Sequence, residues 1–321
     1  MNSIIFICPY FGKLPCYFDL VLKSCEYNRD IDWLIFTDDK TKYKYPKNVK
    51  VEYISFEDLK KEVEKSFKYN IFLGNPYKLC DYKPLYGKLF KKYIEHYDFW
   101  GHCDFDCIFG RLRLFLSEDI LDKYDKIFYL GHMSLYKNND KLNTVINNLI
   151  ENNLLVRKIL SSKKSYGFDE IISIKLLLEN GVKIYLDEKD IADVYCLSKA
   201  FKLVKANIKQ NENILKMSFS NEVDSKNRIF KYNKGILTSI YLNGSMIMEK
   251  EHIYVHFQKR NMLNKVITKD NFLMIPNSFI EYQNISSDFV KKQTRKNFFY
   301  KKFFEIKFKN LNRKLRIYFN K

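Results

Sequence analysis

The chain has 321 residues, of which 46% are hydrophobic, 17% aromatic and 29% charged, a composition that excludes an intrinsically disordered protein. It contains no run of about 18 uncharged apolar residues, so no membrane-spanning helix is expected. The formal net charge is +18. Residues 288–321 carry +10 of it, because that segment contains twelve Lys or Arg and only two Asp or Glu.

The N-terminal segment predicts a buried strand rather than a signal peptide. Residues 3–8 (SIIFIC) are mostly β-branched, aromatic or apolar, and no basic segment precedes them. Without an export signal, the seven scattered Cys are expected to be reduced thiols in a cytoplasmic protein.

Strand and helix patterns alternate over the first 67 residues. The predicted elements are a strand over 3–8, a helix over 16–27, strands over 32–37 and 49–54, and a helix over 56–67. This order predicts a mostly parallel sheet with flanking helices. The loop after the first strand lacks the sequence G-x-G-x-x-G, which argues against a dinucleotide site of the usual kind.

The alternation continues along the rest of the chain. The further predicted elements are a helix over 85–97, strands over 98–103 and 126–130, helices over 141–160 and 168–180, strands over 182–186, 236–242 and 252–257, and a helix from about 288. The sequence therefore predicts an α/β protein with one main domain over 1–287, a central sheet flanked by helices, and a basic helical tail over 288–321.

Two acidic residues, Asp104 and Asp106, follow the apolar strand over 98–103. Alternate residues of an extended segment point to opposite faces, so these carboxylates converge only if the chain turns, as the region of Gly110 allows. Paired carboxylates at the carboxyl end of a strand can hold Mg²⁺ or Mn²⁺ and leave positions open for a diphosphate. The alternative is a solvated acidic turn, but the apolar flanks favour a bound cation, since two buried carboxylates would otherwise repel each other.

A zinc site is a competing interpretation of the same region. His102, Cys103 and Cys107 are potential zinc ligands, but their spacing does not match a zinc knuckle and no second Cys pair follows. Zinc is therefore not expected here.

Five sequence blocks together resemble a known family. They are PYKLCDYKPLYGKLF (76–90), YDFWGHCDFDCIFGRL (97–112), GHMSLYKN (131–138), YGFDE (166–170) and HFQKR (256–260). They are similar to a bacterial family of cytoplasmic surface-polysaccharide glycosyltransferases with a D-x-D motif, and their order resembles that of glycogenin-like enzymes. The similarity covers roughly residues 1–260. It implies a GT-A fold and transfer of a sugar, of the hexosyltransferase type, from a nucleotide-sugar, most often a UDP-sugar, with Mn²⁺ or Mg²⁺.

The resemblance also implies roles for individual residues. Asp104 and Asp106 would bind the metal, Asp104 would also contact the donor, and His256 would complete the metal shell; the Gly and Lys-Pro-Trp of the full glycogenin motif are absent. The other implied donor-binding residues are Pro9, Tyr10 and Phe11 in the nucleotide-facing loop, Thr37 and Asp38 at the base, Lys78, Asp81 and Lys83 at the ribose, sugar hydroxyls or phosphate, and Lys259 with Arg260 at the diphosphate.

Several of these residues also have ordinary interpretations. Lys78 and Lys83 could be surface charges, Tyr10 and Phe11 core residues, and His256 a hydrogen-bonded core histidine. His132, which follows Gly131 after a predicted strand, is a candidate substrate contact or a histidine at the edge of the core.

Asp169 and Glu170 open the predicted helix over 168–180. Acidic residues at a helix start commonly cap the helix or interact with its dipole. In the fold that the sequence resembles, an acidic pair at this point lies under the acceptor and can act as a catalytic base or stabilise the developing oxocarbenium ion. The sequence does not choose between the two residues.

The basic tail predicts a membrane contact. Its large apolar residues recur at helical spacing and form one face: Tyr300, Phe304, Phe308, Leu311, Leu315 and Tyr318. Such a helix is typical of an anionic membrane interface, which predicts a peripheral protein at the inner face of a bacterial plasma membrane. The alternatives are a helix docked on its own domain and a nucleic-acid contact, but no RNA-binding motif accompanies the tail, and nucleic acid is not expected.

The expected function is thus a metal-dependent glycosyltransferase that acts on a glycan or lipid-linked acceptor in surface polysaccharide synthesis. One alternative is a nucleotidyltransferase or metal nuclease that uses the same carboxylates. The single Gly of the loop PYFGKLP disfavours the nucleotidyltransferase, which would need a Gly-rich triphosphate loop. The other alternative is a non-enzymatic basic protein that binds membranes or nucleic acid.

Overall fold

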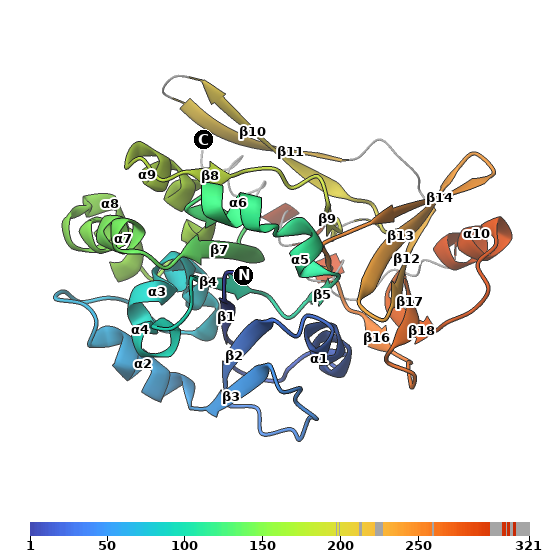
Figure 1. Ribbon diagram of the computed structural model, residues 1–321, viewed down its shortest axis with the longest axis horizontal. Coiled ribbons are helices and arrows are strands. Elements are labelled where there is room, and N and C mark those ends of the chain that lie inside the picture. The colour runs from blue at the N-terminus through green and yellow to red at the C-terminus, as the bar shows by residue number, and fades with distance from the viewer. Residues whose placement is uncertain are drawn as a thin grey trace.

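The fold is a mixed α/β architecture (Figure 1), which confirms the predicted class. The computed structural model describes residues 1–196, 198, 200–211, 214–221, 227–258 and 260–295, together with Phe304, Glu305, Lys307, Phe308, Leu311 and Asn312.

A seven-stranded sheet forms the centre of the fold. Its strands are β1 (Ile4–Pro9), β2 (Ile31–Thr37), β3 (Val49–Tyr53), β4 (Phe99–Cys103), β6 (Lys126–Ile127), β7 (Met133–Lys137) and β8 (Ile184–Tyr185). Their order in space is β3-β2-β1-β4-β7-β6-β8. Strands β3, β2, β1 and β4 are parallel, β7 is antiparallel to both neighbours, and β8 is parallel to β6, so the sheet is mostly parallel, as predicted.

Both faces of this sheet are buried, which explains why its first strands are continuous apolar runs. Along β1, Ile4, Phe6 and Cys8 enter one core and Ile5 and Ile7 enter the other. Each face therefore needs its own covering layer of helices or strands.

The first face packs against three helices and a small sheet. These elements are α1 (Phe18–Glu26), α5 (Leu112–Phe115), α6 (Glu118–Lys123), and the strands β5 (Cys107–Phe109), β9 (Ile191–Asp193) and β15 (Tyr254–His256) in the order β5-β15-β9. The β5 segment follows β4 directly, so the main sheet leads through one turn into the small sheet.

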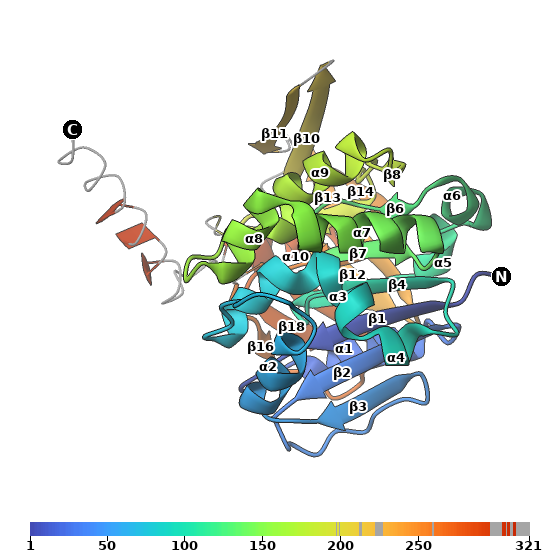
Figure 2. The ribbon, with the colours of Figure 1, turned by 90° about the vertical axis from the view of Figure 1, so that its left-hand side faces the viewer.

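The second face is covered by helices (Figure 2). They are α2 (Phe56–Glu64), the 3₁₀ helix η1 (Pro76–Leu85), α3 (Tyr86–Leu89), α4 (Lys91–Ile94), α7 (Asp140–Asn152), α8 (Leu154–Ser161), the π-helix η2 (Phe168–Ile172) and α9 (Ser173–Glu179). Among the residues that the structure describes, no helix is both long and apolar enough to span a bilayer.

A second, six-stranded sheet lies beside α1 and α5 (Figure 1). Its strands are β12 (Arg228–Asn233), β13 (Ile236–Asn243), β14 (Met246–Glu251), β16 (Leu263–Asn264), β17 (Asn271–Ile275) and β18 (Ser278–Glu281), in the order β14-β13-β12-β17-β18-β16. The hairpin of β10 (Val204–Asn211) and β11 (Ile214–Asn221) projects from the body in both views.

The start of the predicted tail docks on this second sheet. The helix α10 (Ser287–Arg295) covers its outer face, where Val290 is fully buried against Ile229, Ile240 and Leu242. Phe304, Phe308 and Leu311 are exposed, whereas Tyr300, Leu315 and Tyr318 of the predicted apolar face lie outside the described residues.

Several element boundaries differ from the prediction. The helix expected over 85–97 consists of two short helices, α3 and α4, because the backbone of Phe90 between them leaves the helical region (φ −114°, ψ 26°). The strand expected over 126–130 ends at Ile127, since Phe128 has a left-handed backbone (φ 63°). The helix expected over 141–160 is two helices, with Asn153 capping the second through bonds from the N–H groups of residues 155 and 156.

Candidate active site

A cavity of about 700 Å³ opens at the carboxyl ends of β1 and β4. Segments far apart in the sequence contribute its polar lining residues, which are Tyr10, Lys83, Asp104, Asp106, His132, Asp169, Glu170, Asp193, His256 and Gln258. Because strand ends leave polar groups and loops at one edge of a sheet, this is where α/β folds place their ligands.

The predicted D-x-D pair lies in the turn between β4 and β5. The chain reverses at Phe105 and Asp106 rather than at Gly110, where the prediction had placed the turn. The N–H of Asp104 donates to the carbonyl of His132 (2.9 Å), and the N–H of Phe257 donates to the carbonyl of Asp106 (2.9 Å). The turn is thereby held by the backbones of two other segments, and its two carboxylates converge.

The two carboxylates meet an imidazole from β15. One ligand atom each from Asp104, Asp106 and His256 lie within 4.8 Å of one another, and His256 Nε2 is 3.3 Å from Asp106 Oδ1. Two carboxylate oxygens and one imidazole nitrogen form a donor set that suits Mn²⁺, and the oxygens also suit Mg²⁺. The residues present therefore fit the metal that the sequence predicted.

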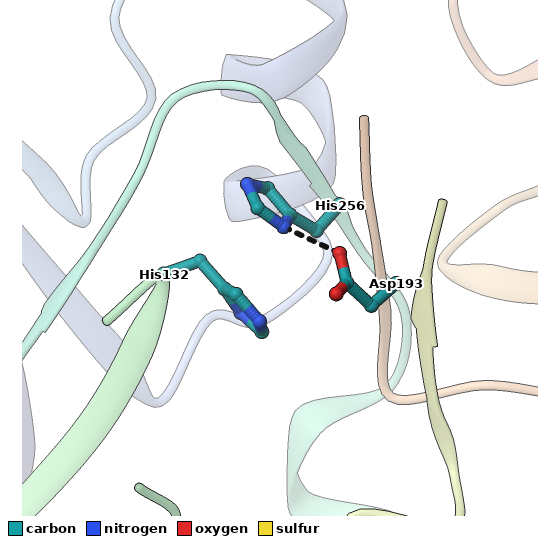
Figure 3. A group of neighbouring side chains, drawn as sticks. All are labelled: His132, Asp193 and His256. Atoms are coloured by element: carbon teal, nitrogen blue, oxygen red, sulfur yellow. Dashed lines mark hydrogen bonds and ion pairs between the residues drawn. The ribbon is translucent and has the colours of Figure 1, made fainter. Parts of the chain in front are cut away.

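His256 is enclosed by a second group of side chains (Figure 3). Asp193 Oδ1 accepts a hydrogen bond from His256 Nδ1 (2.8 Å), and the ring centroids of His132 and His256 are 4.2 Å apart. Burial acts to lower the pKa of His256, but Asp106 and Asp193 outweigh it and raise that pKa to about 10. His256 is consequently a cation at neutral pH while no metal is bound.

His132 lies against the same group but stays neutral. Burial and the neighbouring His256 lower the pKa of His132 to about 3. Its Nδ1 pairs with the hydroxyl of Tyr254 (2.8 Å), and its buried Nε2 has no hydrogen-bond partner among the described residues. His132 thus lines the cavity and keeps one buried polar atom without a partner among the described residues.

Lys83 bridges the two acidic parts of the cavity. Its Nζ donates to Asp104 Oδ1 (2.7 Å) and to the carbonyl of Gly131 (2.7 Å), and it is 3.4 Å from Asp169 Oδ2. Burial opposes its charge, but Asp104 and Asp169 raise the pKa of Lys83 well above its usual value. The three contacts use the donors of this ammonium group, so in this structure Lys83 links carboxylates rather than presenting a free charge.

Asp169 and Glu170 face the cavity from η2. Burial raises the pKa of Asp169, although Lys83 opposes the shift. Burial and, next, Asp169 raise the pKa of Glu170 to about 7. The backbone of Glu170 leaves the helical region (φ −115°, ψ −133°), and its carboxyl group is less buried than that of Asp169. Of the two, Glu170 is the carboxylate that a substrate can reach.

Gly131 is required by the position of Asp169. A Cβ atom at Gly131 would overlap with Asp169 Oδ2. We expect Gly131→Ala to displace this carboxylate from Lys83 and to lower the free energy of unfolding by about 1–3 kcal/mol, the usual cost of overpacking. Urea unfolding measures this loss. The cost should shrink when Asp169→Ala is also present, and an equal cost in both backgrounds would contradict the steric explanation.

Some predicted donor-binding residues have a structural role instead. Lys78 and Asp81 are completely buried and form an ion pair (2.7 Å), so they do not contact a donor. Asp81 accepts hydrogen bonds from the N–H groups of Tyr166 (3.1 Å) and Phe168 (2.9 Å). The pair therefore positions the loop that leads to Asp169.

The end of β2 also differs from the expectation. Thr37 is fully buried, and its hydroxyl accepts a hydrogen bond from the N–H of Asp39 (3.1 Å). The carboxylate of Asp38 accepts from the N–H of Gly12 (2.7 Å), so this residue fixes the loop after β1. Phe11 packs edge-on against Phe56 on the second face of the sheet. These contacts occupy side chains that the sequence assigned to the donor.

The remaining predicted donor contacts are Lys259 and Arg260. Lys259 lies outside the described residues. The guanidinium of Arg260 donates to Asn277 Oδ1 (2.9 Å) and to the carbonyls of Ser198 and Ala200, so it ties loops together.

A second cavity, of about 770 Å³, adjoins the first at the D-x-D turn. Six residues line both cavities, namely Pro9, Tyr10, Tyr77, Asp104, Asp106 and Gln258. The rest of the second lining is mostly aromatic, sulfur-containing or apolar (Cys8, Pro15, Cys16, Tyr17, Cys103, Phe105 and Met262), with Arg260, Asn261 and Glu305 as its polar members. The carboxylates thus stand at the boundary between an aromatic cavity and an acidic one.

Sequence reasoning missed Asp193, Tyr254 and Gln258. Asp193 contacts His256 because β9 and β15 pair with these two residues in register. Tyr254, also on β15, pairs with His132, and Gln258 donates to Asp193. Asp193 and His256 are 63 positions apart, and no local pattern marks them as partners.

Comparisons with known proteins give a family and one distant structural likeness. The profile of the Family of unknown function (DUF6625) matches residues 6–283. No curated protein matches this chain. Among solved structures, the chain is similar to the apo-form glycosyltransferase GlyE of Streptococcus pneumoniae TIGR4, with 11% identity and a TM-score of 0.30. That match covers 60% of this chain and 46% of the other, which is less than half of its length.

Proposed function

This chain belongs to the Family of unknown function (DUF6625), and we propose that it is a metal-dependent glycosyltransferase of the GT-A type. One observation carries the proposal: two carboxylates and an imidazole converge within 4.8 Å between an aromatic and an acidic cavity. A nucleotide-sugar has a matching division, because an anionic diphosphate joins its flat base to its hydroxyl-rich sugar.

The aromatic cavity suits the nucleoside. Tyr10 is part of its wall, packed 5.7 Å from the ring of Phe105, and Tyr17 lines it as well. Aromatic rings bind a base through stacking and provide little hydrogen-bonding selectivity among bases. We propose a uridine diphosphate sugar as the donor because of the sequence resemblance.

The D-x-D turn suits the diphosphate. A divalent cation held by Asp104, Asp106 and His256 would supply positive charge where the diphosphate leaves. Lys83 holds the carboxylate of Asp104 in place, and His132 is part of the lining of the same cavity. The chain's own groups thereby orient the donor and keep its leaving group next to positive charge.

The acidic cavity suits the acceptor hydroxyl. In the transfer, the bond between the sugar C1 and the diphosphate oxygen breaks, and its electron pair leaves with the diphosphate. The acceptor oxygen forms the new bond to C1 and gives its proton to a carboxylate. We assign this base to Glu170, because it reaches the cavity and its pKa of about 7 lets it accept a proton near neutral pH.

The acceptor and the location are further parts of the proposal. We propose a glycan or lipid-linked acceptor in bacterial surface polysaccharide synthesis. The +10 charge of residues 288–321 supports attachment to anionic lipid at the inner face of the plasma membrane. The docked helix α10 would connect this tail to the folded body.

Ligand-dependent stabilisation tests the proposal directly. At 100 times its dissociation constant, a ligand adds about 2.7 kcal/mol, which corresponds to a Tm rise of about 4 °C for a chain of this length. We expect UDP with Mn²⁺ to produce such a rise, and a panel of UDP-sugars to release UDP. No response to any nucleoside diphosphate with Mn²⁺ or Mg²⁺ would contradict the proposal, and release of pyrophosphate from nucleoside triphosphates would favour a nucleotidyltransferase.

A further inference from the structure

We propose that Asp193 is the positioning residue that aligns His256 as a metal ligand. This inference rests on the proposed function, because it assumes that His256 binds the divalent cation. The strand β9 runs parallel to β15, with Asp193 and His256 as register partners. Their side chains therefore project side by side, and Asp193 Oδ1 lies 2.8 Å from His256 Nδ1.

The hydrogen bond determines which nitrogen of His256 faces the metal site. With Nδ1 donating to Asp193, the ring directs Nε2 toward the D-x-D turn, 3.3 Å from Asp106 Oδ1. A carboxylate that accepts from the distal nitrogen of a metal-binding histidine fixes its tautomer and raises its basicity. The geometry of Asp193, His256 and Asp106 is that arrangement.

Asp193 is itself held in place. The Nε2 of Gln258 donates to both carboxylate oxygens of Asp193 (3.0 and 3.1 Å), and Asp193 is 6% exposed. Gln258 reaches this position with a left-handed backbone (φ 52°), a conformation that is uncommon for a non-glycine residue. Such a conformation is found where the surrounding structure needs one side chain in one place.

His132 restrains the remaining freedom of the His256 ring. The centroids of the His132 and His256 rings are 4.2 Å apart, with 31° between the ring planes (Figure 3). The hydrogen bond between the Tyr254 hydroxyl and Nδ1 fixes His132. Asp193 thus fixes the rotation of the His256 ring within its own plane, and His132 restricts the tilt of that plane.

A second cation held by His132, Asp193 and His256 is the competing interpretation, since their ligand atoms also lie within 4.8 Å of one another. An ion at that point would have to separate Asp193 Oδ1 from His256 Nδ1, which are already bonded. We therefore expect one Mn²⁺ per chain rather than two.

The test measures Mn²⁺ binding to the full chain in the presence of UDP. Calorimetry should show one Mn²⁺ bound by the wild type, and Asp193→Ala should weaken the affinity about 10–100-fold. Asp193→Asn should recover part of this loss, because its Oδ1 still accepts from Nδ1, and it remains informative if the Ala variant fails to fold. Asp190→Asn is the matched control, because this carboxylate precedes the same strand but pairs with Lys250 at the surface (3.3 Å).

Electron paramagnetic resonance separates a positioning role from a merely structural one. Wild-type Mn²⁺ should show hyperfine coupling to one histidine nitrogen, and this coupling should weaken in Asp193→Ala and vanish in His256→Ala. Wild-type affinity with full coupling in Asp193→Ala would overturn the inference, as would two Mn²⁺ per wild-type chain with one lost in Asp193→Asn. A wild type that binds no Mn²⁺ would instead overturn the proposed function, and the inference with it.

Discussion

Asp106→Asn is expected to abolish the stabilisation by UDP and Mn²⁺ and to reduce sugar transfer by about 10³-fold or more. The carboxylate of Asp106 lies where the two cavities meet, and it forms an ion pair with His256. Loss of a metal ligand removes several kcal/mol of leaving-group stabilisation, and each 1.36 kcal/mol corresponds to about tenfold in rate. Melting temperatures with and without UDP and Mn²⁺ and initial rates of UDP release measure both effects.

The substitution is conservative for the fold. Asn keeps the size of the side chain, and the carbonyl of residue 106 still accepts from the N–H of Phe257. Asp19→Asn, on α1, is a matched control. The side chains of Asp19 and Asp106 are both 27% exposed, but Asp19 forms an ion pair with Lys269 rather than with His256. A normal response to UDP and Mn²⁺ in Asp106→Asn would show that the D-x-D turn does not bind the cation.

Glu170→Gln is expected to lower kcat by about 10²–10⁴-fold while the response to UDP and Mn²⁺ persists, because the residue would remove the acceptor proton without holding the donor. The wild-type rate should rise with pH up to about 7, because only the ionised carboxylate accepts a proton and burial with Asp169 raises its pKa to that value. Rates of UDP release from pH 5.5 to 9 test this. The residual rate of the Gln variant should no longer rise with pH below about 7.

The free energy of unfolding should fall as pH rises, whereas the rate of UDP release should increase. A carboxyl group whose pKa is higher in the folded than in the unfolded chain binds more protons when folded, so stability falls as pH rises from about 4.5 through 7. Glu170→Gln should remove this contribution, whereas Glu179→Gln, at an exposed position on α9 beside Lys175, should change neither rate nor pH profile. An unchanged kcat in Glu170→Gln, or a rate that still rises with pH below about 7, would assign the base to another group.

Local sequence identified some of the site residues and misassigned others. Asp104 and Asp106 were predictable, because an apolar strand with both faces buried must end in a loop at the sheet edge. Lys78 was assigned to the donor because the family resemblance places a donor contact there, whereas its side chain is buried between η1, its own helix, and α8. Local sequence does not distinguish an exposed lysine from one that is buried with an aspartate three residues later.

Local sequence also failed to predict the six-stranded second sheet. Only strand-like pieces around the turn at Asn243 and Gly244 were predicted in that part of the chain. The six-stranded sheet is formed by pairing β12 with β17, about forty residues away in the chain, and by the docking of α10 on its outer face. Its polar strands gave a weak hydrophobic pattern because β14 is largely exposed.

Local chemistry alone was enough to define the buried strands, the α/β class and a pair of carboxylates at a strand end, because alternation and burial are properties of neighbouring residues. Tertiary structure was needed to choose their partners. Lys83 reaches Asp104 across 21 positions, and His256 reaches Asp193 across 63, through strand pairing and helix packing that no neighbouring residues encode. Proximity in the folded chain, which depends on strand order, therefore decided which charges are shared, which carboxylate is reachable and which histidine faces the metal site.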